Sequence, residues 1–170
     1  MTEAAIITGA ERPAVRLERL LVDPPSVVWA ALTDREQLRR WFPCDVVVTG
    51  GQWTVGSAIS FQFSAEANAM VLTGEVLVAD EPRALPFSWG EEILRFELTA
   101  SEGGTHLVLF DELPPAAAAR NAAGWDVCLD RLAGVALPPD VWQRRFDRYS
   151  VVFEPDLGPQ DGAPADHDGE

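Results

Sequence analysis

Asp111 is the residue whose type and position best suit acid–base chemistry. It follows Leu107 and Leu109 at steps of two, so in an extended strand the three side chains point to one face. If that face is the interior, the carboxyl group has a raised pKa and can hold a proton for acid–base work. The alternative is that the strand has already ended and that Asp111 lies in water beside Glu112. We favour this alternative, because alternation predicts orientation least well at the ends of strands.

The other reactive side chains do not form a catalytic or metal-binding set. By the same alternation His106 points away from the face of Asp111, and His167 lies in the C-terminal segment, so no Ser-His-Asp or Cys-His arrangement is predicted. Cys44 and Cys128 are expected to be small buried apolar residues. The chain has no lysine, which excludes Schiff-base chemistry, and no His, Cys and carboxylate spacing suits a metal. We therefore expect no metal, no cofactor and no defined catalysis.

The charge of the chain argues against two classes of partner. Its 170 residues carry 27 acids and 13 bases, all of them arginine, for a net charge of −14. A surface with this much negative charge repels phosphate backbones and anionic lipid headgroups. We therefore expect neither a nucleic acid nor a membrane as a partner. Two isolated cysteines and the lack of a signal peptide at the start favour the cytoplasm.

The spacing of apolar residues predicts the elements that would position these groups. Residues 1–12 are expected to be a mobile arm, followed by a strand over 14–22. A helix capped by Asp23 then begins at Asp23-Pro24-Pro25, and a second short helix, capped by Asp34, ends at Pro43. From there the period changes from helical to two, which predicts antiparallel strands over 45–49, 58–64, 69–79, 85–89, 93–100 and 105–113.

The C-terminal part is predicted to be helical and then disordered. A long helix runs from Pro114-Pro115 to Leu137 and completes a domain over 13–137. An additional helix over 138–154 carries one aromatic stripe, made of Trp142, Phe146, Tyr149 and Phe153. We expect the stripe to pack on the same domain, which favours a monomer, with a homodimer as the alternative. Residues 155–170 are acidic and rich in Pro and Gly, so we expect a disordered tail, dispensable from residue 157 onward.

Several short sequence segments, taken in their order along the chain, resemble segments of one protein superfamily. The sequence is similar to the START-like, polyketide-cyclase-like (SRPBCC) proteins, and more narrowly to the branch of the C-terminal domain of the activator of the heat-shock-protein-90 ATPase. The resemblance covers about residues 16–137 and implies an α+β helix-grip fold, in which a curved antiparallel sheet of about six or seven strands grips a long C-terminal helix, with two short helices after the first strand. It is carried by residues 25–34 (PSVVWAALTD), 38–42 (LRRWF), 74–76 (GEV), 81–85 (EPRAL), 87–89 (FSW), 104–109 (GTHLVL), 123–125 (AGW) and 129–132 (LDRL).

The resemblance also implies a cavity between the sheet and the long helix. Large apolar side chains on the inner faces are expected to line it, because aromatic walls suit flat or greasy ligands. The alternative is that these side chains only fill the core. The expected lining residues are Trp41, Phe61, Phe63, Met70, Leu72, Trp89, Phe96, Asp111, Trp125 and Leu129.

Three functions are compatible with such a fold, since one scaffold of this kind hosts many activities. The leading hypothesis is a carrier or sensor that binds a small apolar molecule in the cavity. The second is an enzyme of the cyclase or hydrolase type that uses a pocket carboxylate such as Asp111 as acid or base. The third is a protein-binding module, such as a chaperone cofactor, which would act through its surface.

Overall fold

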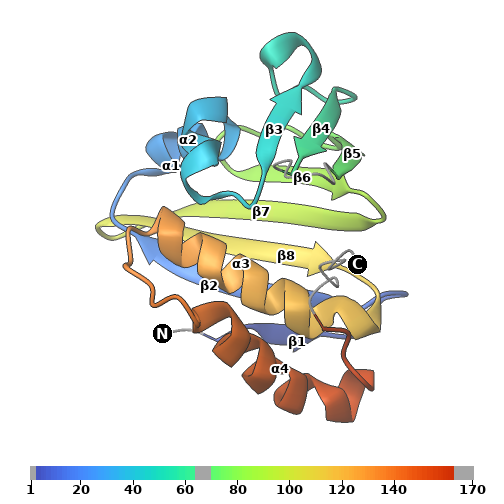
Figure 1. The fold of residues 1–170 in the computed structure, drawn as a ribbon. Helices are drawn as coiled ribbons and strands as arrows, with labels where there is room; N and C mark the ends of the chain where they lie inside the picture. The colour runs from blue at the N-terminus through green and yellow to red at the C-terminus, as the bar shows by residue number, and fades with distance from the viewer. Residues whose placement is uncertain (1–2, 64–69, 163–170) are drawn as a thin grey trace.

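Two antiparallel sheets form the scaffold of the protein, and they join into one curved layer (Figure 1). The computed structural model describes residues 3–63 and 70–162. The larger sheet has the order β1-β2-β8-β7-β6 and the smaller one β3-β4-β5, and a bridge between Val76 and Phe87 connects the two. The strands are β1 (Ala5–Ile7), β2 (Ala14–Leu21), β3 (Asp45–Val48), β4 (Ala58–Gln62), β5 (Val71–Glu75), β6 (Ala84–Trp89), β7 (Glu92–Ser101) and β8 (Gly104–Glu112).

The helices cover one face of this layer. α3 lies across β2 and β8, α4 runs beside α3 toward β1, and α1 and α2 close the far end (Figure 1). This is the predicted helix-grip fold, so the sequence-based expectation of the fold class is confirmed. Among the described residues, no helix has both the length and the apolar composition that crossing a bilayer requires. The helices are α1 (Pro25–Thr33), α2 (Arg35–Trp41), α3 (Ala118–Leu132) and α4 (Val141–Leu157), with 3₁₀ turns at Thr49–Gly51 and Pro115–Ala117.

Local chemistry explains where the helices that frame the site begin and end. Asp34 caps α2 as predicted, because its side chain accepts a hydrogen bond of 2.9 Å from the Gln37 amide. The predicted cap of α1 by Asp23 is wrong: Pro24 occupies the cap position, and no side chain caps this helix. α3 ends at Leu132, five residues before the predicted Leu137.

A glycine stops α3 early. Gly134 has a φ of +77°, its amide bonds to the Arg131 carbonyl, and the Val135 amide bonds to the Asp130 carbonyl. This pair of hydrogen bonds is a Schellman motif, which satisfies the last carbonyls of the helix and favours glycine at the left-handed position. After Gly134 the chain turns away before it reaches α1. The space between the end of α3 and α1 is the cavity described below.

Both chain ends are more ordered than the sequence analysis expected. The predicted mobile arm over 1–12 contains β1, which pairs with β2, and the Ala4 amide donates to the Tyr149 hydroxyl at 3.0 Å. The disordered tail was also predicted to start too early, at residue 155, since α4 continues to Leu157. The expectation for residues 1–2 and 163–170 lies outside the described residues.

Gln160 attaches the segment after α4 to the start of α3. The Ala119 amide donates to its side-chain oxygen at 2.9 Å, and its side-chain nitrogen donates to the Pro115 carbonyl at 3.0 Å. In addition the Asp161 amide bonds to the Ala116 carbonyl at 2.8 Å. An amide in the first turn of a helix has no partner inside the helix, so Gln160 supplies from a distance the cap that α3 lacks locally. Sequence pattern does not reveal such a long-range cap.

We expect the two possible truncations of the C-terminus to differ. A chain that ends at Gly162 keeps Gln160 and should retain the melting temperature of the full chain. A chain that ends at Asp156 loses this cap and should melt about 2–6 °C lower, as for the loss of a helix cap in a chain of this size. Thermal denaturation followed by circular dichroism measures both, and Gln160→Ala in the full chain should reproduce the lower value. Equal melting temperatures for the two truncations would contradict this role.

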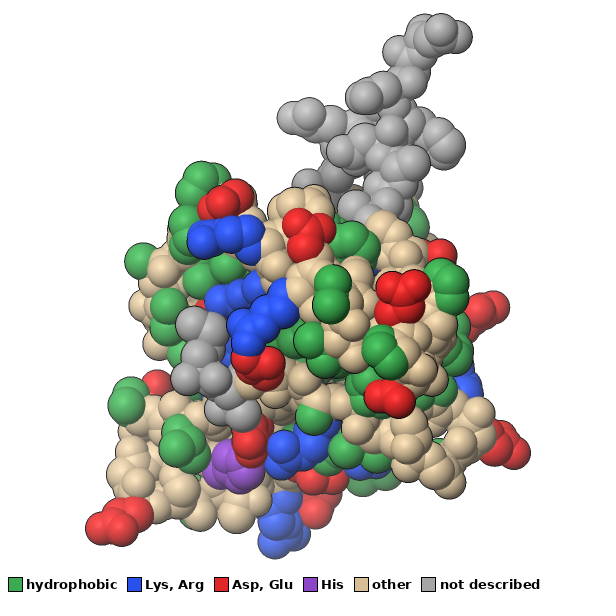
Figure 2. Space-filling model, turned by 90° about the horizontal axis from the view of Figure 1, so that it is seen from below, with side chains coloured by type: hydrophobic (Ala, Val, Ile, Leu, Met, Phe, Trp, Pro, Cys, Tyr) green, Lys and Arg blue, Asp and Glu red, His purple; other side chains and the backbone are tan. Residues whose placement is uncertain are grey.

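The aromatic stripe of α4 packs against its own domain, as predicted. Tyr149 and Phe153 are buried and stacked on each other, and Trp142 stacks on Phe146 with ring centroids 5.2 Å apart. The surface seen from below Figure 1, where α4 lies, carries acidic, basic and hydrophobic side chains interspersed over the face (Figure 2). The stripe is therefore part of the core, and the monomeric state remains a prediction.

A buried charge network also holds α4 to α3 and β2. Asp126 and Asp130, one turn apart on α3, both pair with Arg19 of β2. From α4, Arg145 pairs with Asp130 at 2.6 Å and the Tyr149 hydroxyl donates to Asp126 at 2.8 Å. Burial, the main cause, and the nearby Asp126 raise the pKa of Tyr149 to about 12. Sequence analysis missed this network, because Arg19 lies more than a hundred residues from Asp126 and Asp130 in the chain.

Candidate functional site

Aromatic rings occupy much of the space where a central cavity was expected. The Phe61 and Trp89 ring centroids are 4.5 Å apart, and Trp89 and Phe42 lie 5.6 and 5.4 Å from Trp125. Phe96 continues the cluster toward Trp41 at 6.0 Å. These are distances of direct ring contact. Under α3 the predicted lining residues therefore pack against one another.

The remaining predicted lining residues lie in several places. Leu129 is buried on α3, while Phe63 and Leu72 are half-buried at the margin of the core. Met70 is 49% exposed and lies just before β5, so it does not belong to the interior. Of the ten predicted residues, Trp41 lines the cavity described below and the other nine do not. Whether any of them contacts a ligand remains a prediction.

Asp111 is buried, so the favoured expectation that it lies in water is wrong. β8 continues to Glu112, and Asp111 is fully buried on the inner face opposite Leu94 and Val15. The Trp125 indole donates to its Oδ2 at 3.0 Å. The strand persists here because both neighbouring strands still pair with it.

A second carboxyl group stands next to Asp111. The Asn121 side-chain amide donates to Asp111 at 3.2 Å and to both oxygens of Glu92 at 2.8 and 2.9 Å, so it bridges the two acids. Burial, and then the charge of Glu92, raises the pKa of Asp111 well above its usual range, against the opposing hydrogen bonds from Trp125 and Asn121. Burial raises the pKa of Glu92 as well. A buried and a half-buried carboxyl group that lie side by side and have raised pKa values can share a proton, which is the arrangement that acid–base chemistry uses.

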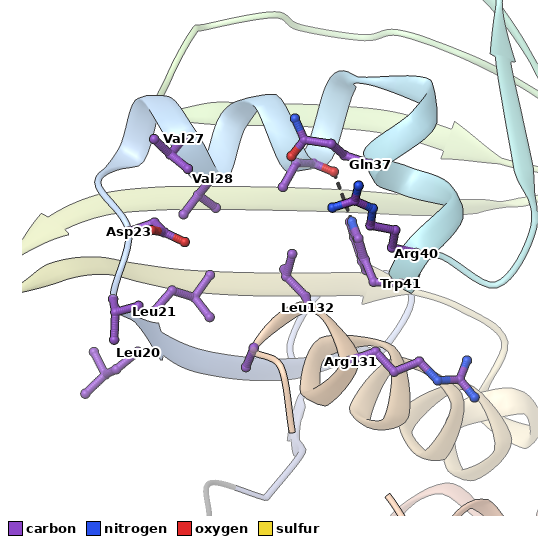
Figure 3. A pocket seen from close by; sticks show the side chains of 13 residues that line it. Leu20, Leu21, Asp23, Val27, Val28, Gln37, Arg40, Trp41, Arg131 and Leu132 are labelled. Carbon is purple, nitrogen blue, oxygen red and sulfur yellow. Dashed lines mark hydrogen bonds between the residues drawn. The ribbon is translucent and has the colours of Figure 1, made fainter. Parts of the chain in front are cut away.

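The cavity lies at the opposite end of α3, where this helix approaches α1 and α2 (Figure 3). Its volume is about 400 Å³. The last residues of β2, the facing sides of α1 and α2, and the last turn of α3 form its walls. The lining residues are Leu20, Leu21, Val22, Asp23, Val27, Val28, Ala31, Gln37, Arg40, Trp41, Arg131, Leu132 and Ala133.

Trp41 forms the wall between this cavity and the aromatic interior. Its indole donates a hydrogen bond of 2.9 Å to the Ala31 carbonyl, which fixes the ring between α1 and α2 (Figure 3). The other side of the ring meets Phe42 and Phe96 edge to face, at 5.4 and 6.0 Å. A ligand in the cavity would therefore contact the indole without entering the core.

Polar side chains stand at two sides of the cavity, and its lining is about as polar as it is apolar. Gln37 and Arg40 come from α2, and the Arg40 guanidinium extends over the cavity, while Arg131 points along α3 away from it (Figure 3). Asp23 lies on the other side, at the end of β2, and the Thr105 hydroxyl donates to its backbone carbonyl at 2.7 Å. The apolar floor is made of Leu21, Val28, Leu132 and Trp41.

One sequence signal could have identified the cavity. Leu20, Leu21 and Val22 are three consecutive apolar residues at the end of a strand, where alternation buries at most every second one. In the structure Leu20 is 77% and Val22 is 87% exposed. Exposed apolar residues beside a hollow are a common mark of a binding site.

Solved structures with the same fold come from several bacteria. CalU16 from Micromonospora echinospora has 21% identity and a TM-score of 0.67, over 89% of this chain and 95% of its own. A protein from Rhodobacter sphaeroides has 24% identity and a TM-score of 0.65, over 78% and 96%. DynU16, a protein of the dynemicin biosynthetic locus, has 24% identity and a TM-score of 0.60, over 71% of this chain and 46% of its own.

The sequence itself identifies the family. No curated protein sequence matches the chain. The family described as activator of Hsp90 ATPase homolog 1-like protein matches residues 23–136, a segment that runs from Asp23 of the cavity through the acid pair to just beyond the end of α3. Because this match covers more than half of the 170 residues, the chain belongs to the family of activator of Hsp90 ATPase homolog 1-like proteins.

Proposed function

We propose that the protein binds a small apolar molecule in the cavity between α1, α2 and the end of α3. The observation that supports this function is a hollow of about 400 Å³ whose lining combines apolar side chains from β2, α1, α2 and α3 with polar groups. Ligand sites in proteins have volumes of about 300–1,000 Å³ and likewise combine apolar and polar groups. The placement of DynU16 in a biosynthetic locus is compatible with small-molecule binding on this fold.

The acid pair supports a second candidate function, acid–base catalysis. Asp111 and Glu92 have the raised pKa values that such chemistry needs. Neither carboxyl lines the cavity, however, and a catalytic acid must come within hydrogen-bonding distance of its substrate. Binding without catalysis is therefore the function that we propose for the cavity.

A fluorescent apolar probe tests the proposal. N-Phenyl-1-naphthylamine is neutral and fluoresces strongly when it leaves water. Ala133→Phe places a ring at the exposed rim of the cavity, and we expect it to weaken binding of this probe by about tenfold or more, since the ring occupies space that the probe would fill. Ala136→Phe, in the same loop but outside the lining, is the matched control and should bind like the original chain.

Two results would contradict the proposal. The first is unchanged probe binding by Ala133→Phe, provided that circular dichroism shows both variants to be folded. The second is an equal loss in Ala133→Phe and Ala136→Phe, which would place the probe outside the cavity.

A further inference from the structure

We propose that the ligand of this cavity is an amphipathic anion, whose apolar body lies on the floor and whose anionic group binds Arg40 and Gln37 of α2. This inference rests on the proposed function and adds the chemical class of the ligand. A carboxylate or sulfonate on a ring system or short chain fits the description.

The first argument is that, among the described residues, no side chain pairs with Arg40. The chain has 27 acids for 13 arginines, so an arginine finds a carboxylate easily. Its neighbour Arg39 pairs with Glu36 at 2.6 Å and with Asp45 at 3.3 Å, and Arg35 pairs with Asp45 at 2.8 Å. Within residues 3–63 and 70–162, the Arg40 side chain makes no ion pair or hydrogen bond. Its guanidinium is thus available to an anion in the cavity.

The second argument is that two donors converge from one helix face. Gln37 and Arg40 are three residues apart on α2, which places them side by side, and both line the cavity. In Figure 3 both side chains lie over the same part of the hollow, next to Trp41. A guanidinium and an amide N–H group together match the oxygens of a carboxylate or sulfonate.

The third argument concerns orientation. Asp23 is the other charged group turned toward the cavity in Figure 3, and it stands across the apolar floor from Arg40. Its negative charge repels an anion, while the Arg131 guanidinium points away and does not offset it. An anionic group is therefore directed to the α2 side, and the apolar body extends over Leu21 and Leu132 toward Asp23.

A matched pair of probes separates the anionic group from the apolar body. 8-Anilinonaphthalene-1-sulfonate has the ring system of N-phenyl-1-naphthylamine and differs from it by one sulfonate group. We expect Arg40→Gln to weaken binding of the sulfonate about fivefold and to change binding of the neutral probe less than twofold, as for a charge-assisted hydrogen bond at a partly exposed site. Arg39→Gln, one residue away and outside the lining, should leave both affinities unchanged.

Two further variants test charge and orientation. Arg40→Lys keeps the charge and should retain most of the sulfonate affinity, although a single ammonium cannot replace the guanidinium fork. Asp23→Asn removes the repelling charge and should strengthen binding of the sulfonate about twofold, with no effect on the neutral probe.

The possible results separate the two proposals. If Ala133→Phe blocks the neutral probe but Arg40→Gln leaves sulfonate binding unchanged, the anionic ligand is overturned and the cavity stands. The anionic ligand is also overturned if the original chain binds the neutral probe and not the sulfonate, or if Asp23→Asn weakens sulfonate binding. If neither probe responds to Ala133→Phe, the cavity is not the binding site and both proposals fail.

Discussion

Replacing Trp125 with alanine is expected to lower the free energy of unfolding by about 3–5 kcal/mol, as for other large buried aromatic residues. The ring is 4% exposed and packs against Phe42 and Trp89 at the centre of the aromatic cluster. The substitution leaves a hole that these neighbours fill only in part, and it removes the indole donor from buried Asp111. Urea denaturation followed by circular dichroism measures the effect.

Trp125→Phe separates the two contributions. It keeps most of the ring contacts and removes the hydrogen bond to Asp111, so its loss should be smaller, about 1–3 kcal/mol for an unsatisfied buried group. Trp142→Ala is the control for a half-buried tryptophan, since this ring contacts Phe146 near the surface. A loss below about 1 kcal/mol in Trp125→Ala would show that this face of α3 is not the centre of the core.

Replacing Asp111 with asparagine is expected to stabilise the protein above neutral pH. The pKa of Asp111 is raised in the folded chain, so folding favours the protonated form. The stability that this proton contributes is fully present below the pKa of an unfolded aspartate, and it is lost as the pH rises through the raised folded-state pKa. Asparagine cannot ionise, and its amide can accept from Trp125 and donate to Glu92.

The measurement is the difference in free energy of unfolding between Asp111→Asn and the original chain at several pH values. It should be close to zero at about pH 4 and should grow to about 1–3 kcal/mol in favour of asparagine at pH 8, the cost of an ionised buried group with incomplete partners. The groups that face Asp111 are Glu92 of β7 and Asn121 and Trp125 of α3. Arg12 and Arg120 act on Glu92 in the opposite direction, because their charges lower its pKa.

Two controls make this result specific. Asp147→Asn changes an exposed aspartate on α4 and should give a difference that is small at every pH. Glu92→Gln removes the neighbouring charge. In chains that carry this substitution, the difference in free energy of unfolding between asparagine and aspartate at position 111 should therefore depend less on pH. A difference that does not vary with pH would mean that Asp111 titrates as it does in the unfolded chain.

The outcome also bears on function. If the protein is more stable with asparagine at position 111, the native aspartate is present at a cost in stability. Residues of this kind occur at functional sites more often than elsewhere, which would support the acid–base alternative. If asparagine is not stabilising, the pair of Asp111 and Glu92 is a structural link between β7, β8 and α3.

The sequence by itself determined the family and most of the elements, although not β1. Alternation placed the strands, as in β8 with Leu107 and Leu109 facing inward, because the direction of a side chain in a strand depends on position alone. Helical spacing likewise predicted the aromatic stripe of α4, since four large apolar side chains on one face require a partner surface, and the short connection favoured the same domain over a second copy. These patterns are local, so a single sequence is sufficient to recognise them.

Only the tertiary structure decided how these elements meet. The burial of Asp111 depends on whether β2 and β7 still pair with the end of β8, and no local pattern records this. The cap of α3 by Gln160 joins residues 41 apart in the chain. The cavity exists because Gly134 ends α3 early while the rings around Trp125 fill the space beneath it. A volume left between several packed elements depends on the shapes of all of them at once, and this is why its position could not be predicted from the sequence.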